Sequence, residues 1–326
     1  MAKMTMVQAL NRALRDAMQE DPSVYVLGED VGVGGGIFRV TDGLIEDFGQ
    51  ERVMDTPLAE SGIVGFAIGM AIAGLKPIAE LQFSGFSYFA WHQLESHAAR
   101  MRWRSRGRYT LPMVIRAPYG AGVRALEHHS ESREAMFAHT PGLKMVLPSG
   151  PRNARALLLS AIADPDPVVF FEPKLNYRSI KEEVPDSPEA LPIGESQIVR
   201  DGRDVTLISY GAMLRRVLDA AEELAKQDGI QAEVIDLLTL SPLDHEKFAE
   251  SVKKTGHAVI VHEAPKSFGP GAEIMARLIE ESFLFLEAPV VRVTGYDVHV
   301  PYFARERAYL PDVDRIVEAA RASLNF

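Results

Sequence analysis

The chain has 326 residues, 47% hydrophobic and 25% charged, which is ordinary for a globular protein of about two domains and excludes disordered, collagen-like and coiled-coil classes. Its formal net charge of −10 argues against general binding of nucleic acid or anionic membranes, because like charges repel. The absence of cysteine excludes a disulfide scaffold, a thiolate metal site and a cysteine nucleophile, and it fits a reducing compartment, so we expect a cytoplasmic protein.

Strands and helices are predicted to alternate along the first half of the chain, starting with a helical pattern at Met6. The expected strands cover residues 24–27, 77–82, 113–117, 144–147 and 168–171, the third ending at Pro118. The expected helices between them cover residues 61–75, 87–104 and 152–163. This alternation is typical of crossover connections and a mostly parallel sheet.

One helix-forming stretch, residues 62–75, is the longest apolar run of the chain and contains no charge. It is shorter than the ~20 residues that a membrane-spanning helix needs. We therefore expect a buried core helix, no membrane partner and, because the first six residues are too few for one, no signal peptide.

The alternation is interrupted between residues 181 and 203, where proline and glycine occur among acidic residues, as is typical of a linker. A second series follows, with strands at 205–210, 232–237, 258–261 and 290–293 and helices at 213–227, 271–282 and 313–323. We therefore predict an α/β fold with a first domain at residues 1–190 and a second at 191–326.

Two motifs resemble known sites but lack the required spacing. Gly32, Gly34 and Gly36 form GxGxG rather than the GxGxxG of a dinucleotide loop, so a flexible loop is favoured over a nicotinamide site. His92 and His97, with a glutamate between them, match no zinc-helix pattern, so a helix surface is favoured over a metal site.

Five arginines recur at every second position between residues 100 and 108, a period that cannot place them on one face of a helix. They indicate either a helix end that continues into an exposed loop or a docking surface for an acidic partner.

Two positions are candidates for proton transfer. Glu60 lies at the start of the apolar helix, where desolvation raises the pKa of a carboxyl group, although acidic residues also favour the first turn of any helix. His128 and His129 follow a glycine-rich turn after a predicted strand, where α/β proteins place their chemistry, although a surface pair in a polar loop is an equal alternative.

Several short motifs occur in a fixed order along the whole chain, and together they resemble one family. They are Leu27–Asp30, Gly35–Arg39, Asp55–Gly62, Glu80–Phe83, His129–Ser130, Phe171–Pro173 and Ser209–Gly211. The set is similar to the beta subunits of the thiamine-diphosphate-dependent 2-oxo acid dehydrogenase component, the decarboxylating part of the pyruvate and branched-chain complexes.

This resemblance implies a pyrimidine-binding thiamine-diphosphate-fold domain followed by a transketolase-type C-terminal domain. It also implies an alpha2-beta2 heterotetramer whose alpha subunit holds magnesium and the cofactor diphosphate through a Gly-Asp-Gly run, which this chain lacks. The chain is then expected to supply half of a shared thiamine diphosphate site, to act on a 2-oxo acid and to pass the acyl group to the lipoyl groups of an acyltransferase core.

By the same resemblance, Glu60 shares a proton with the aminopyrimidine ring of the cofactor, and Leu58, Gln82 and Phe86 help to bind it. His129 assists acyl transfer as a proton donor, with His128 as a weaker candidate.

Two further sites are implied by the resemblance alone. Asp297 and the terminal Phe326 are expected where the acyltransferase core docks, and Asp164 and Asp166 lie near a potassium site of the family.

Pyruvate is the expected substrate, with branched-chain 2-oxo acid and acetoin dehydrogenase subunits as alternatives. A noncatalytic scaffold subunit and a nicotinamide oxidoreductase are the alternatives from other classes.

Overall fold

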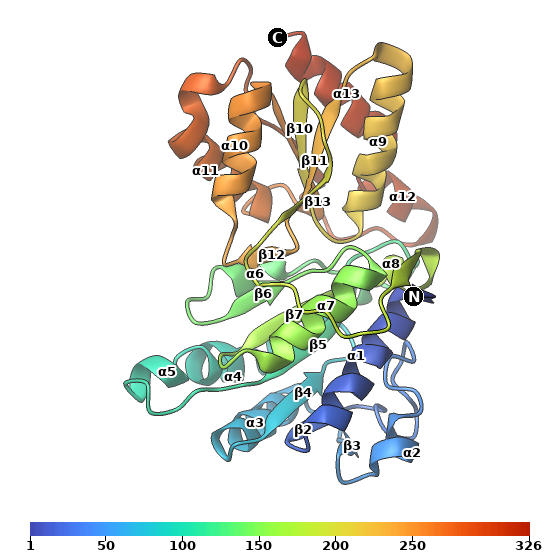
Figure 1. Ribbon diagram of the computed structural model, residues 1–326, viewed down its shortest axis with the longest axis vertical. Coiled ribbons are helices and arrows are strands. Elements are labelled where there is room, and N and C mark those ends of the chain that lie inside the picture. The colour runs from blue at the N-terminus through green and yellow to red at the C-terminus, as the bar shows by residue number, and fades with distance from the viewer. The chain divides into compact units, whose positions relative to one another are not determined.

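The computed structural model describes residues 1–326, and the chain divides into two compact units (Figure 1). The first unit comprises Met1–Tyr119 and Met136–Ile193, and the second comprises Gly120–Ala135 and Gly194–Phe326. The segment Gly120–Ala135 therefore follows the first unit in sequence but belongs to the second by its contacts.

The first unit is built on a parallel sheet whose strands lie in the order β6-β7-β5-β4-β2-β3 (Figure 1). The strands are β2 (Val24–Gly28), β3 (Val53–Asp55), β4 (Lys76–Glu80), β5 (Val114–Tyr119), β6 (Lys144–Val146) and β7 (Val168–Pro173). Because all of them run in one direction, their carboxyl ends meet at one edge of the sheet, where α/β proteins place their ligand sites.

The helices of this unit pack in pairs, α1 (Met6–Glu20) with α7 (Pro151–Ala163), and α3 (Glu60–Ile72) with α4 (Ser87–Gln93). Thr5 and Gln8 form a capping box at the start of α1, which satisfies helix N–H groups that have no partner within the helix. The shorter helices are α2 (Leu44–Phe48), α5 (Met101–Arg104), α6 (Glu134–Ala138) and α8 (Asn176–Ser179), of which α6 spans the boundary of the two units.

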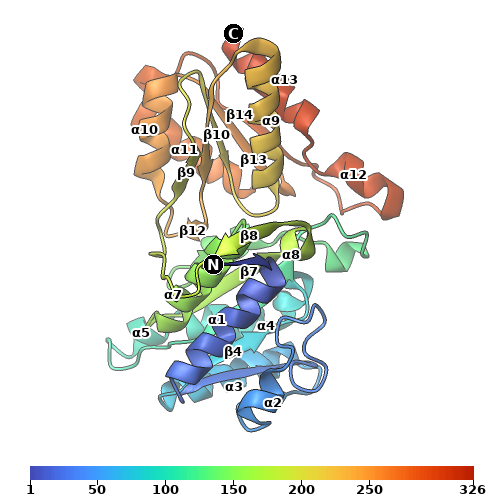
Figure 2. The same cartoon turned by 45° about the vertical axis from the view of Figure 1, so that its right-hand side comes forward.

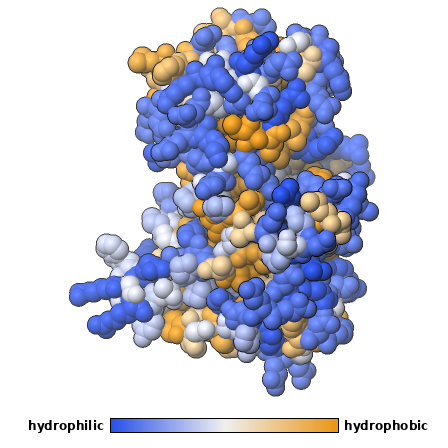
Figure 3. Space-filling view, viewed as in Figure 1, coloured by the Kyte–Doolittle hydropathy of each residue, from blue (hydrophilic) through white to orange (hydrophobic).

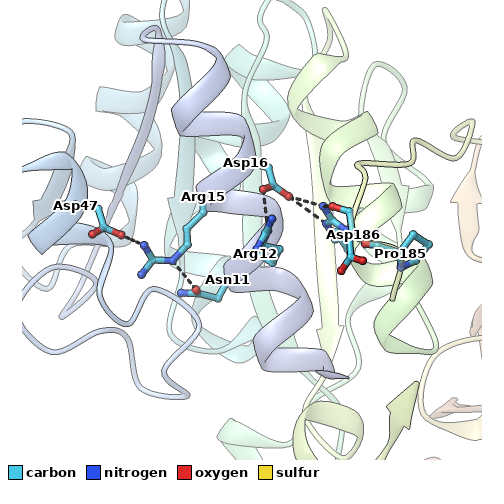
Figure 4. Close-up of polar contacts among 8 residues, drawn as sticks. Asn11, Arg12, Arg15, Asp16, Asp47, Pro185 and Asp186 are labelled. Carbon is cyan, nitrogen blue, oxygen red and sulfur yellow. Dashed lines mark hydrogen bonds and ion pairs between the residues drawn. The ribbon is translucent and has the colours of Figure 1, made fainter. Parts of the chain in front are cut away.

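Polar contacts fasten α1 to segments that are distant in sequence (Figure 4). Arg155 of α7 donates to Asp16 of α1 at 2.6 Å and also to the carbonyl oxygen of Pro185, while Arg15 forms an ion pair with Asp47. A short antiparallel sheet of β1 (Ala2–Thr5) and β8 (Lys181–Val184) closes the same side of the unit.

The second unit has a five-stranded sheet in the order β14-β13-β10-β11-β9, in which only β9 is antiparallel to its neighbour. Helices α10 and α11 cover one face, and α9 and α13 cover the other (Figures 1 and 2). The strands are β9 (Gln197–Arg200), β10 (Val205–Ser209), β11 (Ala232–Asp236), β13 (Ala258–Pro265) and β14 (Val291–Gly295), with a short β12 (Thr239–Ser241) outside this sheet. The helices are α9 (Met213–Asp228), α10 (His245–Thr255), α11 (Pro270–Ser282), α12 (Glu306–Tyr309) and α13 (Val313–Leu324).

Three sequence predictions are wrong in detail. The strand predicted to end at Pro118 continues to Tyr119, because β4 ends at Glu80 opposite Arg116 and the missing N–H of Pro118 costs no bond toward β4. The helix predicted over residues 87–104 is interrupted by a π-helical turn at Leu94–Ala98.

The third is the predicted linker at residues 181–203, which contains the division between the two units at Ile193 and Gly194 but also includes both β8 and β9. β8 pairs with β1 and β9 pairs with β11. The two strands therefore form through pairing with distant segments, which the local proline and glycine content does not predict. Helix α10 was not predicted, although Phe248, Ala249 and Val252 have helical spacing and are buried.

None of the helices combines the length and the apolar character that a membrane-spanning segment requires. The face seen in Figure 3 is mainly hydrophilic, with apolar residues confined to smaller patches.

Candidate active site

The carboxyl edge of the first sheet gathers polar side chains from several strands. Glu29 follows β2, Asp55 ends β3, Gln82 follows β4 and Lys174 follows β7. This edge is where the fold predicts a ligand site.

Glu60 is the first residue of α3, directly after the loop that leaves β3 at this edge. Its side chain is only 7% exposed, because the helix that follows it is apolar and rich in glycine and alanine and packs against α4. Acidic residues are favoured in the first turn of a helix, and Glu60 occupies that position in α3.

Glu29 is a second buried carboxyl group at this site and was not predicted from the sequence. It is 8% exposed, and its Oε1 atom has no hydrogen-bond partner. Burial raises the pKa of Glu29, and the negative charge of Glu60 raises it further. The available sequence signal was an acidic residue directly after the apolar strand β2, within the motif Leu27–Asp30.

The glycine-rich loop after β2 is held by the protein itself. Asp55 accepts hydrogen bonds from the backbone N–H of Gly32 at 2.6 Å and of Val33 at 3.2 Å. A Cβ atom at Gly32 would lie 2.8 Å from the Asp55 carboxylate. These loop amides thus bind an internal carboxylate, which favours the structural interpretation of the GxGxG motif over a cofactor-phosphate loop.

A cavity of about 370 Å³ lies against the loop before α3 and the first turns of that helix. Its lining residues are Met54, Asp55, Thr56, Pro57, Ala59, Gly62, Ile63 and Phe66. Leu58, in the same loop, is 78% exposed, which leaves its side chain available to a ligand or a partner chain.

Two other predicted cofactor-binding residues lie on the segment after β4. Phe86 is half-buried, and its ring meets that of Phe83 edge to face at 5.8 Å. Gln82 donates a hydrogen bond to Asp30 at 3.2 Å. These contacts hold the side chains of Phe86 and Gln82 near the carboxyl edge of the sheet, where Glu29 and the start of α3 also lie.

A buried charge cluster joins three strands at this edge. Arg116 of β5 donates to both oxygens of Glu172 on β7, at 2.6 and 2.9 Å, and to Glu80 of β4 at 2.7 Å. The hydroxyl of Tyr177 also donates to Glu172, at 2.6 Å. Burial raises the pKa of Glu80, against the opposing effect of Arg116. The cluster fixes the strand ends from which the site loops leave.

The two predicted histidines are grouped with the second unit rather than with Glu60. His128 and His129 lie in a single 3-10 turn, Glu127–His129, of the segment Gly120–Ala135 and are half-buried. Their ring centroids lie 6.3 Å apart.

The other predicted positions are distributed over the surface. Asp297 is exposed and accepts two hydrogen bonds from Ser267, at 2.8 and 2.7 Å, which lower the pKa of its carboxyl group. The terminal Phe326 is also exposed. The carboxylates of Asp164 and Asp166 form ion pairs with Lys144 and Arg102, and no group of three or more metal-ligating side chains occurs in the chain.

The regularly spaced arginines are partly engaged within the first unit. Arg100 binds Glu95 at 2.9 Å and Arg104 donates to the carbonyl oxygen of Ser96 at 2.5 Å, which favours the helix-end interpretation for these two. His92 and His97 are ring neighbours with centroids 5.1 Å apart and belong to no metal-ligating group.

Comparison with known families divides the chain into two matched regions. Residues 2–180 match the model described as transketolase, pyrimidine binding domain, and residues 194–316 match transketolase, C-terminal domain. The chain is 51% identical over 321 residues to the pyruvate dehydrogenase E1 component subunit beta of Acholeplasma laidlawii, covering 98% of both chains. The chain belongs to the family of pyruvate dehydrogenase E1 component beta subunits.

A second relative, the pyruvate dehydrogenase E1 component subunit beta of Bacillus subtilis (strain 168), is 48% identical over all of both chains. A solved structure described as "Split gene transketolase, inactive beta4 tetramer" is similar with a TM-score of 0.82 at 24% identity, covering 99% of both chains, and supports the fold alone. These findings confirm the predicted fold class and the family resemblance.

Proposed function

We propose that the chain is the beta subunit of a pyruvate dehydrogenase-type component, which oxidatively decarboxylates a 2-oxo acid with thiamine diphosphate. The proposal extends to transfer of the acyl group to the lipoyl groups of an acyltransferase. Full-length relatives named as pyruvate dehydrogenase E1 beta subunits favour pyruvate as the substrate. The observation that carries the assignment is the buried Glu60 at the entrance to an apolar helix, at the carboxyl edge of a parallel sheet.

The residues at this edge fit the pyrimidine end of thiamine diphosphate. An aminopyrimidine needs an apolar surface for its ring and a carboxylate for its ring nitrogen, and Phe86, Leu58 and Glu60 supply these. When bound, the coenzyme supplies the carbon nucleophile and takes up the electrons released by decarboxylation. Glu60 holds and returns a proton at the ring nitrogen, and Gln82 contributes to the polar side of the site.

Transfer of the acyl group to a lipoyl disulfide requires a proton for one of the two sulfur atoms. One sulfur of the lipoyl disulfide bonds to the acyl carbon, the S–S bond breaks, and the other sulfur keeps its electron pair and takes a proton. We assign that proton to His129, with His128 as the alternative donor, because an imidazole exchanges protons near neutral pH.

The chain supplies only part of the complete site. By the family resemblance, an alpha chain holds magnesium and the diphosphate through a Gly-Asp-Gly run, which this chain lacks. We propose an alpha2-beta2 heterotetramer located in the cytoplasm, with acyltransferase docking at Asp297 and Phe326. A potassium ion near Asp164 and Asp166 would need backbone carbonyl ligands, since both carboxylates are ion-paired.

Reconstitution with the alpha chain tests the overall proposal. We expect the isolated chain to bind thiamine diphosphate weakly by titration calorimetry and the mixture to bind it tightly and oxidise pyruvate. A substrate panel then separates the alternatives, because turnover of branched-chain 2-oxo acids or acetoin without pyruvate turnover would contradict the substrate assignment.

Substitution of Glu60 tests its catalytic role. Glu60→Gln keeps the size of the side chain but removes its ability to accept a proton, so we expect a 10²–10⁴-fold lower turnover in the reconstituted enzyme. Glu46→Gln, at an exposed glutamate in the first turn of α2, is the matched control and is expected to leave turnover unchanged. Wild-type turnover in Glu60→Gln would instead support a noncatalytic scaffold subunit.

A further inference from the structure

The segment Gly120–Ala135, which carries His128 and His129, is bound at its start by two buried carboxylates of the second unit. Glu263 of β13 accepts a hydrogen bond from the backbone N–H of Ala121 at 2.7 Å. Glu306, the first residue of α12, accepts from the N–H of Gly122 at 2.9 Å and from the N–H of Arg124 at 3.0 Å. Both carboxylates belong to segments more than a hundred residues away in sequence.

The backbone of the segment is shaped to receive these carboxylates. Gly120, Gly122 and Arg124 all have positive φ, at 84°, 98° and 57°, which turns successive N–H groups toward one side. A Cβ atom at Gly120 would lie 2.5 Å from the Glu263 carboxylate, so only glycine fits this close approach. The backbone conformation of the turn therefore matches the positions of the two carboxylates.

The rest of the segment is fastened on both sides of the histidines. Before them, Glu127 accepts a hydrogen bond from the hydroxyl of Tyr302. After them, the fully buried Glu134 accepts from the hydroxyl of Tyr210 at 2.8 Å. Within the segment, the N–H of Gly120 binds the carbonyl oxygen of Glu131 at 3.0 Å, which closes the loop around the 3-10 turn.

Burial of these carboxylates is a poor way to stabilise a surface loop. Glu263 and Glu306 are 3% and 2% exposed, and each accepts hydrogen bonds from backbone N–H groups of the segment. The Arg216 guanidinium also interacts electrostatically with Glu263. Water would satisfy the same N–H groups without the desolvation of a charge, so such an arrangement is favoured where the position of the backbone matters.

We propose that Glu263 and Glu306 are positioning residues that hold the Gly120–Ala135 segment so that His129 is presented to the acyl-transfer reaction. They touch neither substrate nor cofactor and act through the backbone of the segment. This inference rests on the proposed function of the chain and adds the residues that govern its acyl-transfer step.

Glu306→Gln in the heterotetramer reconstituted with the alpha chain tests the inference. The amide keeps one acceptor but places an N–H₂ group against the backbone N–H donors. By hydrogen exchange and mass spectrometry, we expect at least 10-fold faster exchange in peptides covering residues 120–135. Glu306→Asp, which restores the charge, should recover part of the protection, and Glu318→Gln, at an exposed glutamate of α13, should change nothing.

Two activity measurements then separate positioning from general stability. Oxidation of pyruvate with ferricyanide bypasses the lipoyl group, and we expect Glu306→Gln to retain it within twofold. Acetylation of an isolated lipoyl domain should fall at least 10-fold in kcat and recover partly in Glu306→Asp. Unchanged exchange, an equal loss in both assays or an unchanged lipoyl rate would each overturn the inference. Wild-type enzyme inactive toward every 2-oxo acid would instead refute the proposed function, independently of any substitution.

Discussion

Replacement of Arg116 by methionine probes the buried charge cluster that joins β4, β5 and β7. Arg116 is 1% exposed and provides the cation for both Glu80 and Glu172, which are themselves buried. Methionine fills much of the same volume but leaves two buried carboxyl groups without a cation. Breaking a buried ion pair by removal of one partner typically costs about 3–5 kcal/mol, and we expect a loss of that size in the free energy of unfolding of the first unit near pH 8.

The loss should depend on pH in a defined direction. Without the opposing effect of Arg116, burial and the nearby Glu172 raise the pKa of Glu80 further, so Glu80 takes up a proton more readily in the folded state. The folded variant then regains stability as the pH falls from 8 to 5. The loss should therefore be smaller near pH 5 than near pH 8.

Urea denaturation of the full chain, followed by circular dichroism at pH 8 and pH 5, measures both effects. Arg102→Met is the matched control, because Arg102 forms an exposed ion pair with Asp166 and its removal should change stability little at either pH. The double substitution Arg116→Met with Glu172→Gln removes one of the two stranded charges and should recover part of the loss at pH 8. A loss in Arg116→Met no larger than that of the control, or one independent of pH, would refute the reasoning.

Three further substitutions have defined outcomes. Burial raises the pKa of Glu134 to about 7, so the folded wild type loses stability as the pH rises from about 4.5 to 7. Glu134→Gln keeps an acceptor for the Tyr210 hydroxyl and should be more stable than the wild type by up to about 3 kcal/mol at pH 8. In the same denaturation assay it should show no gain near pH 4.5. Thr5→Ala removes the amino-terminal cap of α1 and should cost about 1 kcal/mol, whereas Thr5→Ser should cost less. Gly142→Ala should lower the melting temperature clearly, because the added Cβ would lie 2.0 Å from the carbonyl oxygen of Ala99 at a positive φ; an unchanged melting temperature would contradict this.

The sequence determined the features that depend on short stretches of chain. The apolar run at residues 62–75 predicted helix α3, although the helix is not fully buried as expected, because Phe66 and Ile72 are exposed. The alternation of strands and helices predicted the parallel sheet. Glu60 could be chosen as a candidate because its neighbours in sequence are also its neighbours in the helix. The ordered motifs predicted the family, which the full-length relatives confirm.

Only the tertiary structure decided which distant residues meet. Arg116 lies 36 residues from Glu80 and 56 from Glu172, and their pairing depends on the order and register of three strands. The electrostatic coupling of Glu29 to Glu60 likewise needs the loops after β2 and β3 to lie at one edge of the sheet.

The same reason explains the segment that carries His129. Its residues follow β5 in sequence, but Glu306 binds its backbone from 184 residues away and groups it with the second unit. Local patterns record the preference of a few residues for a helix, strand or turn, whereas a buried carboxylate finds its N–H partners only after the whole chain has folded.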